Sequence, residues 1–244
     1  MFKQNASAII FSLAIILGVI LLSSAYKYKF KSTETIVVTG LAEKDFASDQ
    51  IVWKGSFNRS GSDLKSIYAL LKQDEVEIKN YLKGKGIPDS CIVFSSVDLQ
   101  KIFDSKYDEN GKYIGTAFRG NTLVGQVTID SKEIDKVEKV SREVTELLQS
   151  GIEFNSKQPL YYYSKLNDIK IDLLANASAD AKLRAETIAK NSGVSIGNLK
   201  KATMGVFQIT GKNSNEDYSY GGVFNTSSKA KTASVTLRAE FIVN

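Results

Sequence analysis

A stretch of twenty residues without a charged side chain, Ala6 to Ala25, is the strongest constraint on how this 244-residue chain can fold. Its letters are ASAIIFSLAIILGVILLSSA, and a helix of that length is about 30 Å long, enough to cross the hydrocarbon core of a bilayer. Backbone groups in hydrocarbon need hydrogen-bond partners within their own segment, which a helix provides. Tyr26 and Tyr28 follow where an aromatic belt would lie. The sequence therefore predicts one N-terminal transmembrane helix that contacts the lipid bilayer through residues 6–25.

Two interpretations of this segment stay open. An uncleaved anchor fits because the apolar core is longer than the roughly 7–15 residues typical of a signal peptide. A cleaved signal peptide fits because Ser23 and Ala25 are small residues at a suitable cleavage site. Lysine counting would by itself favour a cytoplasmic domain, by a narrow margin, since one lysine precedes the segment and three follow it: Lys3, Lys27, Lys29 and Lys31.

Charge and the rare residue types exclude several function classes. The net charge is +5, and the four lysines of residues 1–31, with no acid there, leave +1 (5 − 4) for the remainder. No basic stripe for nucleic acid is therefore expected on the folded domain. The chain has one cysteine, Cys91, and no histidine, which excludes an internal disulfide, a cysteine-based zinc site and a histidine-activated nucleophile. Cys91 is expected to be a small packed thiol.

Acidic residues are the remaining candidates for chemistry, and each has a structural explanation as well. Asp108, Glu109, Glu216 and Asp217 lie in polar turns without the spacing of a calcium loop, so solvated turns are expected. Glu75 falls in the apolar stripe of a predicted helix, where it would either hint at acid–base chemistry or pair with a lysine. The sequence therefore predicts no enzyme, no catalytic residues, no metal site and no cofactor.

Residues 32–244, after an anchor and flank at residues 1–31, alternate between helical and strand periodicity. This predicts one α+β domain, a mainly antiparallel sheet with three long helices packed on it. The helices are expected at residues 62–85, 130–150 and 168–192. Strands are expected at residues 35–42, 49–59, 92–107, 113–129, 152–163, 200–210 and 233–243. The second helix is predicted to begin at Asp130 as N-cap and to bury Ile134, Val137, Val144 and Leu148.

Two regions carry the clearest strand patterns. Residues 92–107 and 113–129 predict a long hairpin, in which Asn110 and Gly111 supply the positive φ angles of a tight turn. The last strand alternates, which predicts one covered face. Its inward set is Ala233, Val235, Leu237, Ala239, Phe241 and Val243, and its outward set is Ser234, Thr236, Arg238 and Glu240. The polar residues 211–231 predict an arm or loop before it.

The helix predicted at 168–192 is rich in alanine. A helical wheel places five small or apolar residues on one side: Leu174, Ala177, Ala181, Ala185 and Ile188. Small side chains let a helix axis approach a sheet closely, and alanine has the highest helix propensity. The stripe therefore indicates a packing element and not a cofactor site.

Four phrases, in order, resemble the SIMPL domain family, a group of bacterial envelope proteins that includes periplasmic immunogenic antigens. They are IVVTGLAEKDFASDQIVWKGSF, LKGKGIPDSCIVFSSVDL, AFRGNTLVGQVTID and ADAKLRAETIAKNSGVSIGNL, and together they cover nearly all of residues 34–243. Two stretches depart from the family pattern. QSGIEFNSKQPLYYY replaces a common G-A-N phrase, and Leu41 and Glu43 flank Ala42 where a second glycine is typical.

The resemblance implies an α+β domain on the periplasmic or outer side of a bacterial cytoplasmic (inner) membrane, held by a single span, with no established catalytic chemistry. Secretion to the periplasm after signal cleavage is the alternative. The predicted function is a self-associating structural or stress-related envelope protein, a homo-oligomer. A glycan-binding or small-ligand-binding module and a carboxylate-dependent hydrolase are the alternatives. Because tyrosine is enriched at interfaces, the candidate contact residues for a second copy, an envelope protein or a glycan are Tyr161, Tyr162, Tyr163, Tyr218, Tyr220 and Phe224.

Overall fold

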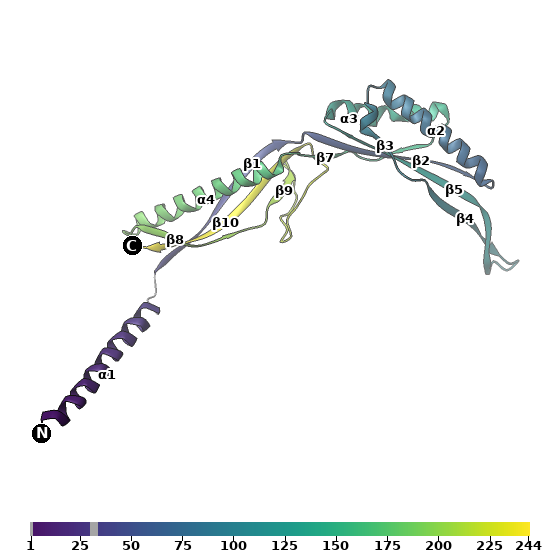
Figure 1. Cartoon of the computed structure of the whole chain (residues 1–244). Coiled ribbons are helices and arrows are strands. Elements are labelled where there is room, and N and C mark those ends of the chain that lie inside the picture. Colours follow the sequence, from purple (N-terminus) through teal and green to yellow (C-terminus); the bar gives the residue numbers. More distant parts are fainter. Residues whose placement is uncertain (1, 30–33) are drawn as a thin grey trace. The chain divides into compact units, whose positions relative to one another are not determined.

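The structure is a computed structural model that describes the backbone of residues 2–29 and 34–244, with the side chains of residues 10–28 and 34–244 (Figure 1). The predicted boundary between residues 31 and 32 lies outside the described residues, as does Lys31. Helix α1 (Phe2–Lys29) contains a stretch, residues 10–28, that is long and apolar enough to cross a membrane. An anchor and a signal sequence share these properties, so α1 agrees with both interpretations.

The rest of the described chain has α+β structure with antiparallel strand pairs, as predicted. Its elements, in order, are β1 (Thr35–Ala47), β2 (Gln50–Gly61), α2 (Leu64–Gly84), the 3-10 helix η1 (Asp89–Cys91), β3 (Ile92–Phe94), β4 (Asp98–Tyr107), β5 (Tyr113–Ser131), α3 (Ile134–Glu143), the 3-10 helix η2 (Val144–Ser150), β6 (Phe154–Ser156), β7 (Leu160–Tyr162), α4 (Leu166–Asn191), β8 (Ile196–Met204), β9 (Gln208–Gly211) and β10 (Ala230–Val243).

The strands form two sheets where one sheet was predicted, because β2 and β10 each organise their own set of strand pairs, and the chain divides into two compact units. The larger unit comprises residues 42–176 and 206–236, and the smaller unit comprises residues 1–41, 177–205 and 237–244. One sheet has the order β3-β5-β2-β6, with β4 also paired to β5 and β7 also paired to β2. The other has the order β1-β10-β8, with β9 also paired to β10.

The larger unit is built on the long pairing of β2 with β5, from Ile51 opposite Ser131 to Gly61 opposite Asn121. Helices α2 and α3 contact this sheet, and the side chains between them form the core of the unit. Ile51, Trp53 and Phe57 lie on one face of β2 and are buried. Alternation along β2 and helical spacing along α2 direct apolar side chains to the same interior.

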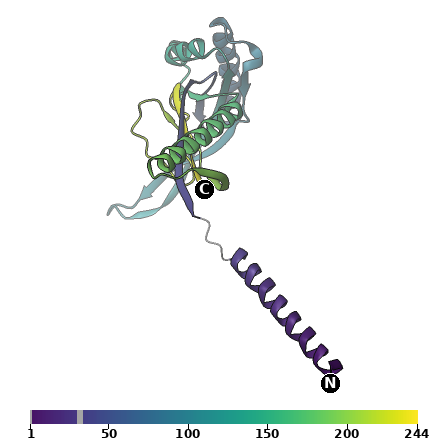
Figure 2. The same cartoon turned by 90° about the vertical axis from the view of Figure 1, so that its left-hand side faces the viewer.

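In the smaller unit, α4 lies along β1, as Figure 2 shows. Its approach is closest at Gly40, where a built Cβ would lie 2.2 Å from the carbonyl oxygen of Ala177 and 2.8 Å from Cβ of Ala181. Position 40 therefore has to be glycine, and position 181 has to carry a small side chain, for the backbones of β1 and α4 to approach this closely. The predicted packing role of the alanine stripe is confirmed.

The stripe itself is one residue away from its predicted position at both ends. The buried residues of α4 recur at every fourth position, as Ile169, Leu173, Ala177, Ala181 and Ala185.

 

Ala189, which is 1 % exposed, completes this series. Leu174 is half-buried and Ile188 is 46 % exposed, so these two predictions are wrong. The buried side of α4 is a single row of residues spaced four apart, which is one of the ridges by which helices pack. The helical wheel instead assigned the larger apolar residues Leu174 and Ile188 to this side.

The second predicted helix is shorter than expected. β5 continues to Ser131, so Asp130 belongs to a strand, pairs opposite Val52, and accepts a hydrogen bond from the side chain of Gln50. It is not an N-cap. After ten residues α3 tightens into η2, whose three-residue period buries Val144 and Leu147, while Leu148 is 56 % exposed. The predicted burial of Leu148 is therefore wrong.

Three smaller expectations also change. Gly111 has φ 77°, but Asn110 does not have a positive φ, because Asp108 organises the turn by accepting hydrogen bonds from the backbone N–H groups of Asn110 and Lys112. In β10, Ser234 is buried instead of exposed. The strand predicted at residues 200–210 is two strands, β8 and β9, which pair with different parts of β10.

Candidate interaction surfaces

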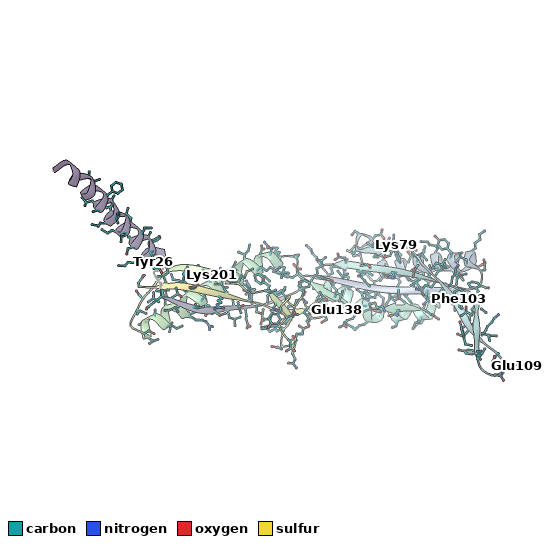
Figure 3. The ribbon with its side chains drawn as sticks, turned by 90° about the horizontal axis from the view of Figure 1, so that it is seen from below. Tyr26, Lys79, Phe103, Glu109, Glu138 and Lys201 are labelled. Atoms are coloured by element: carbon teal, nitrogen blue, oxygen red, sulfur yellow. The ribbon has the colours of Figure 1, made fainter. Side chains whose placement is uncertain are left out.

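The hairpin of β4 and β5 carries four exposed aromatic rings on one face. Phe103 lies opposite Phe118 with ring centroids 5.9 Å apart, and Tyr107 lies opposite Tyr113 with centroids 6.0 Å apart. All four side chains are more than half exposed, as is Ile114 beside them. Figure 3 shows Phe103 on this hairpin and Glu109 at its tip. We call the set Phe103, Tyr107, Tyr113, Ile114 and Phe118 the aromatic face.

The register of the hairpin explains why these rings share one face. Residues 113–120 of β5 pair with β4 alone, since β2 pairs with residues 121–131. Figure 1 shows this end of the hairpin extending away from α2. Alternation places Asp104 on the opposite face, where its carboxylate lies 3.5 Å from the guanidinium of Arg119. The sequence carried a signal for the aromatic face, namely Phe103 and Tyr107 four residues apart on a predicted strand, but not its exposure.

The predicted arm, residues 211–231, is an ordered loop held by its own polar groups. Glu216 accepts hydrogen bonds from the backbone N–H of Gly211 at 2.8 Å and from the side chain of Asn225 at 2.5 Å. The hydrogen bond from Gly211 is the main reason that the pKa of Glu216 lies below its ordinary value. Lys231, 2 % exposed, donates to the carbonyl oxygen of Asn225 at 2.7 Å, and its burial lowers the pKa of its ammonium group.

The predicted contact residues of this loop project from it. Tyr218 and Phe224 are more than half exposed, and Tyr220 is fully exposed. Gln208 holds the loop beneath them, donating to the carbonyl oxygen of Ser219 and accepting from the N–H of Val223. An ordered loop that presents aromatic side chains has the form of a binding surface. That these residues contact a partner stays a prediction.

The other predicted contact residues lie in and beside β7 and are half-buried. The hydroxyl of Tyr161 donates to Glu138 at 2.8 Å, and burial, aided by this hydrogen bond, raises the pKa of Tyr161 to about 12. Tyr162 pairs opposite Gln50 in the sheet. The ring of Tyr163 packs against Phe46, with centroids 5.1 Å apart. These three tyrosines therefore have structural contacts within the larger unit.

A third surface is an open groove of about 680 Å³ in the smaller unit, between β1 and α4. Its lining residues are Val37, Val38, Thr39, Asp180, Leu183, Arg184, Thr187 and Ile188. Leu183 and Ile188 are exposed there. Asp180 accepts a hydrogen bond from the backbone N–H of Leu41 at 2.8 Å, which is the main reason that the pKa of its carboxyl group is lowered.

Three acidic candidates, Glu75, Asp108 and Glu216, form hydrogen bonds or ion pairs, and Glu109 and Asp217 are exposed. Glu75 lies 2.7 Å from the ammonium group of Lys72, as the ion-pair interpretation predicted. The carboxylate that is buried in α2 is Asp74, which the sequence analysis missed and which accepts two hydrogen bonds from Arg59, at 2.6 and 2.7 Å.

No group of three or more acidic or cysteine side chains suited to a metal ion occurs among the residues that the structure describes. Cys91 ends η1 and packs partly against the core of the larger unit.

Comparison with known families gives one match. Residues 36–241 match the family model described as SIMPL, protein of unknown function (DUF541). The matched segment begins in β1 and ends in β10, so it includes every element of both sheets. No curated protein matches the chain.

Proposed function

The chain belongs to the SIMPL family, and we propose that it is a membrane-anchored, non-enzymatic protein of the bacterial envelope that acts by assembling with further copies of itself. In this proposal α1 remains uncleaved and crosses the cytoplasmic membrane once, with residues 34–244 on the outer side. The length and apolar composition of α1 support the anchor. The resemblance to envelope proteins supports the outer location.

The aromatic face of the hairpin is the observation that carries self-association. Its four rings are 53–61 % exposed, and an aromatic side chain buries roughly 200 Å² when fully covered. Covering the exposed parts of the four rings would remove roughly 400 Å² from water, which corresponds to about 10 kcal/mol before the costs of association. Exposed apolar patches of this size on soluble surfaces commonly mark contact sites.

The test is the mass of the full-length chain in a mild detergent, measured by light scattering with the detergent contribution subtracted. The wild-type chain is expected to form a discrete oligomer. Phe103→Ser combined with Phe118→Ser should reduce its mass, because it removes one of the two ring pairs. Tyr68→Ser is the matched control, since Tyr68 is an exposed aromatic residue of α2 outside this face.

Two results would count against the proposal. A wild-type chain that is monomeric in detergent and in lipid nanodiscs at all accessible concentrations would exclude self-association as its function. An oligomer that the double variant leaves unchanged would show that the aromatic face is not the contact surface. Circular dichroism of each variant would check that the fold is retained.

A further inference from the structure

β1 is an edge strand whose outer backbone groups can be identified. β1 stands at one end of the order β1-β10-β8. The carbonyl oxygen of Glu34 accepts a hydrogen bond from the N–H of Val243 in β10, whereas the N–H of Leu41 donates a hydrogen bond to the carboxylate of Asp180 in α4. Since the N–H and C=O of one strand residue point to the same edge, even-numbered residues face β10 and odd-numbered residues face outward. The outer edge therefore presents the backbone groups of Thr35, Val37 and Thr39.

The first part of this edge, residues 35–42, lacks the devices that usually prevent strands from pairing between molecules, whereas the end of β1 carries Glu43, Lys44 and Asp45. Residues 35–42 contain no charged side chain and no proline, although lysines and prolines are common protections of edge strands. The edge strand at the other end of the path, β8, does carry such protection in the exposed neighbours Lys200 and Lys201. The contrast within one sheet singles out residues 35–42 of β1 as the edge segment that can accept another strand.

We infer that the outer edge of β1 pairs antiparallel with β1 of a second copy of this chain, about a two-fold axis that passes beside Val37. This contact rests on the proposed self-association but uses a surface separate from the aromatic face. Antiparallel self-pairing places each residue near its own counterpart, so a charged strand would repel itself. The uncharged segment 35–42 meets this requirement.

Asp180 determines the register. With Val37 opposite its own counterpart, Thr35 lies opposite Thr39 of the second copy, and three pairs share about six backbone hydrogen bonds. Moving the axis by one residue toward Val38 would bring the N–H of Leu41 into the ladder, and that group is already bonded to Asp180.

The groove supplies the side-chain contacts of the added strand. In the pairing, Ile36 of the second copy lies on the face that α4 covers and is only partly buried in its own copy, whereas Val38 beside it is already buried there. The groove there is bordered by Leu183 and Ile188 of α4, which are 62 % and 46 % exposed. An added strand would bring the apolar side chain of Ile36 to this border, where Leu183 and Ile188 are apolar although nothing within the described chain buries them.

Cysteine crosslinking of the full-length chain in mild detergent tests the pairing. In a Cys91→Ser background, Val37→Cys places two cysteines opposite each other with Cα atoms about 5.5 Å apart, within reach of a disulfide. Thr39→Cys is the matched control, because its two copies would lie roughly 14 Å apart. We expect mild oxidation to give a covalent dimer with Val37→Cys, at least tenfold more than with Thr39→Cys.

A charge exchange provides a second test that does not depend on oxidation. Val37→Lys and Val37→Glu should each abolish pairing through β1 when present alone, because like charges would face each other across the axis, while association through the aromatic face remains. Mixing the two variants should restore it. Val37 is 47 % exposed, so both variants are expected to fold.

The outcomes separate this inference from the proposed function. Equal or stronger crosslinking at Thr39→Cys would overturn the register and with it the inference. A failure of both cysteines in a chain that light scattering shows to be oligomeric would overturn β1 pairing and leave self-association in place. A monomeric chain would overturn both.

Discussion

Gly40→Ala is the sharpest test of the packing between β1 and α4. The added Cβ would lie 2.2 Å from the carbonyl oxygen of Ala177, 2.6 Å from the backbone N of Ala181 and 2.8 Å from its Cβ. Two of these atoms are backbone, so no side-chain rotation relieves the overlap. Either the strand or the helix has to move.

The expected cost follows from this geometry. Inserting a methyl group into a packed interior commonly costs 1–3 kcal/mol, and more where the backbone has to shift. We expect about 3 kcal/mol for Gly40→Ala. For a protein of this size each kcal/mol lowers Tm by roughly 2–4 °C, so the transition should fall by roughly 6–12 °C.

Thermal unfolding of the full-length chain in detergent, followed by circular dichroism, measures this loss. The control is Gly84→Ala in α2, where a Cβ meets no atom within 4 Å and alanine favours the helix. Its Tm should stay unchanged or rise slightly. Hydrogen exchange should also show faster exchange in β1 and α4 of the Gly40→Ala variant. A Tm within about 1 °C of the wild-type value would refute the close-packing argument.

Three further predictions concern polar groups of the larger unit. Arg59→Ala should lower the free energy of unfolding in urea by about 3 kcal/mol, because it leaves the carboxylate of Asp74, whose side chain is 6 % exposed, without its partner. A smaller loss in the double variant with Asp74→Asn would identify the ion pair as the cause, and additive losses would contradict it. Tyr161→Phe should remove the last tyrosine to ionise in an alkaline ultraviolet titration, because the folded-state pKa of Tyr161 is raised to about 12. The stabilising contribution of this tyrosine is present below pH 10 and is lost between pH 10 and 12. A titration curve that the substitution leaves unchanged would contradict this assignment. Glu216→Gln should weaken the acid dependence of protease cleavage in the arm. The pKa of Glu216 is lowered from its ordinary value of 4.5, so the ionised carboxylate stabilises the loop above about pH 4.5, and this contribution is lost as the pH falls through the lowered pKa. Identical pH profiles of cleavage for the two proteins would count against this prediction.

Local patterns were sufficient for much of the secondary structure. Alternation and the turn at Gly111, which has φ 77°, correctly predicted the hairpin of β4 and β5, because both act over a few residues. Asp130 misled the prediction because the same residue can cap a helix or extend a strand, and the choice was made by the distant partner Val52.

The candidate surfaces were harder to predict than the fold. Tyr161 and Tyr218 are both tyrosines in polar surroundings, yet one donates to Glu138 from a half-buried position and the other projects from a loop. Sequence composition assigned them to one class, because hydrogen-bond partners far away in the chain are invisible to it. The aromatic face was missed for the same reason, since exposure depends on which neighbours are absent.

The sequence by itself determined the apolar N-terminal helix, the order of strands and helices, the family and the absence of histidine chemistry. These properties depend on composition and on spacings of a few residues, which act within one turn or one strand. Only the tertiary structure decided that the strands form two sheets, that the alanine row meets Gly40, that Asp74 pairs with Arg59 and that β1 is left as an open edge. Each of these depends on which segments meet after the chain has folded, and burial and strand pairing are properties of that meeting rather than of any single segment.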